Sequence, residues 1–255
     1  SHTVSDLYRG ALATTWYDPS SRRASFHAIN EATWTLMALS SWSTPDTAWS
    51  TPASPRDEST CTASSLESLT DVVATALHAD TRFLAKAKAT NSAFTKRRQG
   101  VFKYTCGGAH LMQGVFHAHI QGIGSRMTER GLEEQVTLLL YRLPIELEQI
   151  DSAIESNPQY KVPLAVQRLK LTGHTLETLS RISVSEHPKA PHPATLEPVI
   201  EEVIKSVELL SQFSVYKHLH IAKTENHQLF LDVVGDSAHA LRGLNIAYGD
   251  QAVFY

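Results

Sequence analysis

The residues with the clearest potential for chemistry lie in one nearly uncharged stretch, Val101 to Ser125, which reads VFKYTCGGAHLMQGVFHAHIQGIGS. Its apolar residues fall on almost every side of a helical wheel, which is typical of a helix buried all round. One stripe is different, because its residues are polar and follow the i, i+4, i+7, i+11, i+15 spacing of a single helix face: Cys106, His110, Gln113, His117 and Gln121. Thiolate and imidazole are ligands of zinc and other transition metals. The stripe therefore predicts a polar site, with Cys106, His110 and His117 as candidate metal ligands.

Three short motifs indicate which other segments would complete such a site. GGAH at His110, TGH at His174 and GDSAH at His239 are spaced 64 and 65 residues apart, each with a glycine shortly before the histidine. The recurrence is too degenerate to define a repeat, but it predicts three similarly placed helices. Glu177 lies three residues after His174, and Asp236 three residues before His239, so we expect each imidazole to have a carboxylate on its own helix.

A further histidine and carboxylate, His27 and Glu31, share a helical stripe with Trp34 near the N-terminus. A helical bundle that points imidazoles and carboxylates inward can hold zinc or non-haem iron. Because the paired E-x-x-H motifs of di-iron proteins are missing, a mononuclear site fits better. The predicted ligands, or residues that orient ligands, are His110, His117, Cys106, His174, His239, Glu177, His27 and Glu31.

Each of these residues also has a purely structural interpretation. His110 and His117 could hydrogen-bond inside a core, and Cys106 could be an inert buried thiol. His174 shares its stripe with charged residues, as on a solvent-exposed helix face. Two classes of function therefore stay open. One is a metal-dependent enzyme that acts on a small molecule at an open coordination position, and the other is a non-enzymatic helical small-molecule-binding or scaffold protein with a structural polar core.

The elements that would position these side chains are helices. Helical periodicity recurs along the whole chain, whereas hairpin signals do not, so we predict an all-α multi-helix bundle around a central helix at about 101–125. Gly107, Gly108 and Gly114 would each cost about 1 kcal/mol inside that helix, so we expect the close approach of a neighbouring helix or of a ligand to compensate. The other helices are expected at 5–17, 23–42, 65–77, 82–94, 128–143, 146–154, 162–182, 196–211 and 228–246, where Pro144 either kinks one helix or separates the two pieces on either side of it.

Two segments interrupt the helical pattern. Residues 43–65 are dominated by Ser, Thr and Pro without an apolar period, and we predict a long loop there. Residues 185–198 contain four prolines and are the best linker candidate. We expect a single helical domain over 1–255, with this linker as the candidate point of subdivision.

Composition excludes several classes of function. A net charge of -3, with 42% hydrophobic and 19% charged residues, is ordinary for a soluble globular protein and gives no general attraction to nucleic acid. No run reaches about 18 apolar residues, so no membrane span is predicted. Signal-peptide, P-loop, G-x-S-x-G, H-E-x-x-H and C-x-x-C patterns are all missing. The compartment, the oligomeric state, the reaction and a disulfide between Cys61 and Cys106 are left open.

Overall fold

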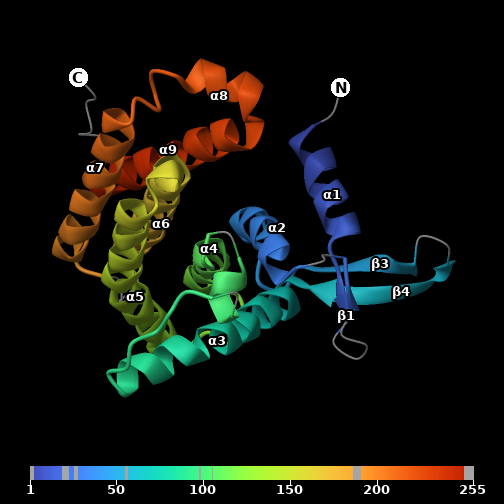
Figure 1. Cartoon of the computed structure of the whole chain (residues 1–255). Helices are drawn as coiled ribbons and strands as arrows, with labels where there is room; N and C mark the ends of the chain where they lie inside the picture. Colours follow the sequence, from blue (N-terminus) through green and yellow to red (C-terminus); the bar gives the residue numbers. More distant parts are fainter. Residues whose placement is uncertain are drawn as a thin grey trace.

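The computed structural model describes residues 3–18, 23–25, 28–54, 57–97, 99–104, 106–185 and 191–249. Helices dominate these residues, and the predicted all-α bundle is confirmed (Figure 1). The helices are α1 (Val4–Thr14), α2 (Ile29–Trp42), α3 (Leu66–Ala89), α4 (Ala109–Ile120), α5 (Glu129–Ser156), α6 (Lys161–Ser183), α7 (Glu197–Gln212), α8 (Leu219–Glu225) and α9 (His227–Tyr248). Short 3-10 helices occupy Gly100–Lys103, Pro158–Tyr160 and Pro193–Thr195.

Several helices begin where the sequence supplies an N-cap. The side chains of Ser65, Thr128 and Asn226 each accept a hydrogen bond from a backbone N–H in the first turn of α3, α5 and α9. Thr3 forms a complete capping box with Asp6 at the start of α1. These helix starts are therefore specified by residues next to them in the sequence.

The central helix is α4, and it is shorter than the predicted 101–125. Figure 1 shows α4 in the middle of the bundle, and it packs against α2, α3 and α6. It begins only at Ala109, because Gly107 and Gly108 adopt φ values of +58° and +78° that a right-handed helix does not allow. A side chain at Gly107 would also overlap the guanidinium of Arg142. The 3-10 helix at Gly100–Lys103 and the turn at Gly107 and Gly108 therefore replace the first two predicted turns of this helix.

The core forms where α4 meets the surrounding helices. Leucines from α2, α3, α5, α6 and α7 pack into one continuous cluster with the apolar residues of α4, among which Leu111 and Val115 are fully buried. Burial on this scale is the main stabilising contribution to the fold. Within the described part of the chain, no helix is long and apolar enough to cross a membrane.

The segment predicted as a loop at 43–65 forms a hairpin instead. Strands β3 (Ala48–Ser54) and β4 (Asp57–Ser65) pair antiparallel, with Ala48 opposite Ser65, and Figure 1 shows this hairpin projecting away from the helices. A second pair, β1 (Tyr17–Asp18) and β2 (Arg23–Ala24), is very short. The loop prediction relied on missing apolar alternation, but Thr-rich polar strands can pair without an apolar face. Beyond the Pro-rich linker, α7 packs back against α6.

Candidate metal centre

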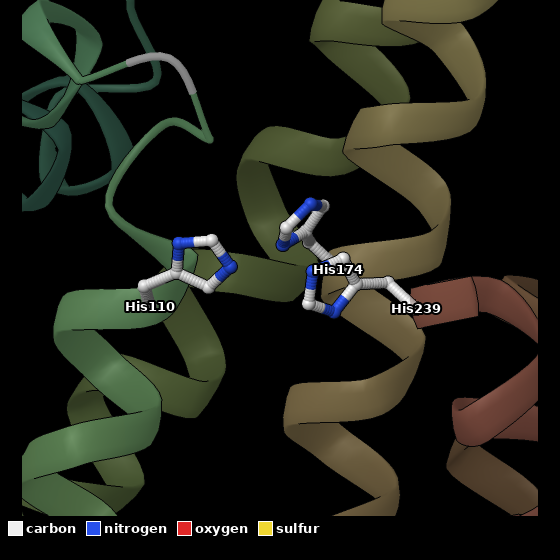
Figure 2. Close-up of side chains that lie close together, drawn as sticks. All are labelled: His110, His174 and His239. Atoms are coloured by element: carbon white, nitrogen blue, oxygen red, sulfur yellow. The ribbon is translucent and has the colours of Figure 1, made fainter. Parts of the chain in front are cut away.

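Three histidines from three different helices converge at one point. His110 lies in the first turn of α4, His174 in the middle of α6 and His239 in α9. The ring centroids are 3.9 Å apart for His174 and His239, 4.5 Å for His110 and His174, and 5.3 Å for His110 and His239. Figure 2 shows the rings gathered from separate ribbons, with a nitrogen of His110 turned toward the other two. Each ring offers one nitrogen, and these nitrogens lie within 4.8 Å of one another.

A cross-helix ladder between α6 and α9 positions two of these rings. Its three rungs join residues 62 positions apart, so the two helices run parallel and in register: Lys170 with Asp232, His174 with Asp236, and Glu177 with His239. Both helices carry their ladder residues at i, i+4 and i+7, the spacing of one helix face. The sequence therefore held a signal for this contact, in the matching patterns K-x-x-x-H-x-x-E and D-x-x-x-D-x-x-H.

Glycines allow α6 and α9 to approach closely enough for that ladder. A methyl group at Gly243 would lie only 2.8 Å from the backbone nitrogen of Glu177. A methyl group at Gly173 would lie 3.1 Å from Ala240 Cβ. Because neither position has a side chain, the two backbones come near each other, and the imidazoles of His174 and His239 are brought together.

The first turn of α4 is held in place from α5. Arg142 donates a hydrogen bond from Nη1 to the carbonyl oxygen of Gly107 at 2.6 Å and pairs through Nε with Glu146 at 2.5 Å. Both side chains are almost fully buried, and the nearest further cation is Lys96 at 3.3 Å from Glu146. A buried, charge-assisted contact of this kind fixes the turn that aims His110 into the cluster.

Helix α2 covers the cluster on the side of His110. Gly114 in α4 permits this, because a Cβ there would lie 2.6 Å from Thr33 Cγ2, which confirms the expected close neighbour. The Trp34 ring consequently packs against His110 with centroids 4.4 Å apart. Trp34 is 48% exposed and the His239 side chain 24% exposed, so the cluster lies just beneath the surface.

The outer hydrogen bonds of the histidines cross between the helices. Glu177 Oε2 accepts from His239 Nδ1 at 2.5 Å, and Asp236 Oδ1 lies 3.3 Å from His174 Nε2. Each of these two histidines therefore hydrogen-bonds to a carboxylate of the facing helix, not to the carboxylate on its own helix. In both pairs the carboxylate binds one ring nitrogen, which leaves the other available.

Burial keeps two of the histidines neutral. Desolvation, together with the nearby imidazoles, lowers the pKa of His110 and that of His174 to about 3. His110 Nε2 and His174 Nδ1 are buried and have no hydrogen-bond partner. Unpartnered buried nitrogens are costly, and a neutral imidazole with a free lone pair is the form that binds metals.

The two carboxylates differ in charge state. Burial by itself would raise the pKa of Glu177, but hydrogen bonds from His239 and Arg181 outweigh it and lower the pKa to about 2. Burial raises the pKa of Asp236 to about 7, although Lys170, 3.7 Å from its Oδ2, acts in the opposite direction. Glu177 is therefore ionised at neutral pH, whereas Asp236 is close to half-protonated.

Other residues predicted for the site lie elsewhere. His117 is two helical turns from His110, roughly 10 Å along the axis, and its Nε2 is 2.8 Å from Ser41 Oγ. Cys106 precedes α4 and has a free, buried thiol 3.8 Å from the side-chain oxygen of Asn30. Glu31 is exposed in the first turn of α2, and Gln113, from the same stripe as His117, donates to Thr178. His27 lies outside the described residues.

Sequence reasoning misplaced the surroundings of His174. The charged stripe of α6 suggests a solvent-exposed face, yet His174 is 3% exposed and Lys170 8% exposed. Helix α6 is enclosed by α4, α5, α7 and α9, so its polar stripe is buried and finds its partners on α9. Lys170 and Arg181 thereby join the site, because they pair with Asp236 and Glu177, respectively.

Comparison with models of known protein families, with curated proteins and with solved structures finds no match to this chain. The kind of protein is therefore described by its fold and its histidine cluster alone. The chain forms an all-α bundle in which three histidines from α4, α6 and α9 make a cluster that could hold a metal ion.

Proposed function

We propose that this protein binds a single zinc ion through His110, His174 and His239, with water as the fourth ligand. The observation that carries this proposal is the convergence of three imidazoles from three helices, two of which have buried nitrogens without a hydrogen-bond partner. Such nitrogens are destabilising unless something binds them, and a metal ion would bind both at once.

The spacing of the rings suits a metal of this size. Zn–N distances of about 2.0–2.1 Å in a tetrahedral site imply nitrogens about 3.3 Å apart. The candidate nitrogens lie within 4.8 Å of one another, so each pair must close by at most roughly 1.5 Å. Rotation of the three rings about their side-chain torsions is the movement that would close this gap.

The ligand set favours zinc over non-haem iron. Three imidazoles with an open fourth position are a known arrangement of catalytic zinc, whereas non-haem iron oxygenases typically use two histidines and a carboxylate. Here the carboxylates of Glu177 and Asp236 bind the outer nitrogens of His239 and His174, where they would orient the rings and increase their basicity.

An enzymatic role for this zinc is the next step of the proposal. Zinc lowers the pKa of a bound water to about 7, which supplies a hydroxide for hydrolysis or hydration of a small molecule. The partly exposed rings of Trp34 and His239 leave the cluster close to solvent, where a small substrate could reach the open position.

Elemental analysis of protein purified without a metal-affinity step tests the proposal. We expect about one zinc per chain in the wild type and in His117→Gln, and its loss in His110→Gln. The control is matched, because both histidines lie on α4. Metal-free protein that does not take up added zinc would overturn the proposal, as would equal zinc loss in both variants.

A non-enzymatic helical protein with a structural polar core is the second candidate. One observation favours it: Lys170 and Arg181 already form ion pairs with the carboxyl groups of Asp236 and Glu177 without any metal. In that case chelation leaves the melting temperature unchanged, whereas a zinc protein would melt at a lower temperature once its metal is removed.

A further inference from the structure

The outward face of α9 carries an apolar stripe that nothing in the described chain covers. Leu231, Val234, Leu241 and Tyr248 are between 44% and 56% exposed. Together with two other exposed residues they follow strict alternating steps of three and four: Leu231, Val234, Ala238, Leu241, Asn245 and Tyr248. We call these six residues the α9 seam. Single exposed apolar side chains are common, but this regular spacing along one helix is not.

The opposite face of α9 is buried against the bundle. Val233, Asp236, Ala240 and Gly243 are buried, and the close α6–α9 packing accounts for them. The helix is therefore held rigidly from one side and presents its second apolar stripe to solvent. Steps of three and four define a heptad repeat, in which Leu231, Ala238 and Asn245 occupy the a positions and Val234, Leu241 and Tyr248 the d positions.

We propose that the α9 seam is a homodimer interface, in which α9 pairs with α9 of a second copy as a short parallel two-stranded coiled coil. Asn245 determines the choice of partner and direction. In a parallel pair the two Asn245 side chains face each other and can exchange hydrogen bonds, which is the known role of an a-position asparagine in setting register. In an antiparallel pair centred on the seam, Asn245 would face Val234 and lose its partners.

The charges along α9 are compatible with this pairing. None of the six seam residues is charged. Arg242, at an e position, would face Ser237 at a g position of the second copy, so no like charges meet across the interface. Helix α9 has 22 residues and is thus about 33 Å long, and it would contribute roughly 13 residues to the interface. Standard interfaces use about 20–30 residues a side, so we expect a weak, concentration-dependent dimer.

Sedimentation velocity over a concentration series tests the proposal. We expect the wild type to shift from monomer to dimer as its concentration rises, and Leu241→Glu to stay monomeric. Ile204→Glu on α7 is the matched control, because Ile204 is 47% exposed and Leu241 48% exposed. Circular dichroism shows whether the variants are folded. A wild type that is monomeric at every concentration, or a dimer that both variants retain, would overturn the proposal.

Cross-linking tests the direction of the pairing. In the parallel register the two residues at position 245 are adjacent, so Asn245→Cys should form a disulfide-linked dimer under mild oxidation, which the wild type with its native cysteines should not. Dimers of this variant that fail to cross-link would refute the parallel arrangement. None of these results depends on the metal site, so the dimer proposal and the zinc proposal are tested independently.

Discussion

Replacing Gly243 by alanine probes the close contact between α6 and α9 that brings two of the histidines together. The added methyl group would lie 2.8 Å from Glu177 N and 2.9 Å from Leu176 Cγ, whereas ordinary contacts begin at 3.4 Å. The helices must then separate by about half an ångström or more. Overpacking of this kind costs about 1–3 kcal/mol, and the better helix propensity of alanine returns about 1 kcal/mol.

A matched control lies on the same helix. Gly235 is also inside α9, but a methyl group there meets nothing within 4 Å, so Gly235→Ala should stabilise the protein by about 0.5–1 kcal/mol. Both variants make the same chemical change, so the difference between their free energies of unfolding isolates the overpacking cost, about 1–3 kcal/mol. Urea unfolding of metal-free protein at low concentration measures that difference.

Zinc affinity gives a second measure of the same contact. Because Gly243→Ala moves His174 away from His239, it should weaken zinc binding, whereas Gly235→Ala should not. Equal unfolding free energies for the two variants would show that the helices do not approach as closely as the structure indicates. The geometric argument for the cluster would then lose its basis.

Three other perturbations have defined outcomes. In urea unfolding, the free energy of unfolding of the metal-free protein should fall by about 2 kcal/mol between pH 7 and 5, which is the net of a loss from two histidines and a smaller gain from Asp236. His110 and His174, with pKa values of about 3 against 6.5 unfolded, contribute stability above pH 6.5 that is lost on acidification, about 2 kcal/mol each. Asp236, with its pKa raised from 3.8 to about 7, gains about 2 kcal/mol over the same range. Arg142→Met should lower the unfolding free energy by about 3–5 kcal/mol, because the buried Glu146 carboxylate loses its Arg142 partner. Adding Glu146→Gln to this variant should recover part of that loss. Zinc should change the fluorescence of the wild type but not of Trp34→Phe, since Trp34 packs on His110.

Distinct results would contradict each of these. Stability that is flat or rising from pH 7 to 5 would mean that the two histidines are not held neutral by burial. A double variant no more stable than Arg142→Met would show that the buried carboxylate is not the source of the loss. An unchanged zinc response in Trp34→Phe would place the metal away from that ring.

Much of the architecture could be predicted from the sequence, because helical periodicity and caps act locally. Three of the residues proposed from sequence, His110, His174 and His239, do converge. Of the glycines in the glycine-histidine recurrence, Gly173 lies at the close α6–α9 contact, whereas a methyl group at Gly235 would meet nothing within 4 Å. The hairpin at 48–65 was missed, since two polar strands carry no apolar pattern. The late start of α4, at Ala109 and not near residue 101, was missed because uninterrupted hydrophobicity hid the Gly107 turn.

Which side chains contact each histidine could not be predicted from local sequence patterns. A shared helix face placed His117 with His110, but side chains two turns apart cannot reach one ion, and His117 meets Ser41 instead. The pairing of Glu177 with His239 depends on which helices are neighbours and in which direction they run. That information is tertiary, and single-helix spacing does not contain it.

X-ray absorption spectroscopy of the zinc-loaded protein tests the central claim most directly. We expect one zinc per chain with three imidazole nitrogens and one oxygen at about 2.0–2.1 Å. A sulfur ligand at about 2.3 Å, which would point to Cys106 or Cys61, or fewer than three imidazoles around the metal, would contradict the three-histidine site.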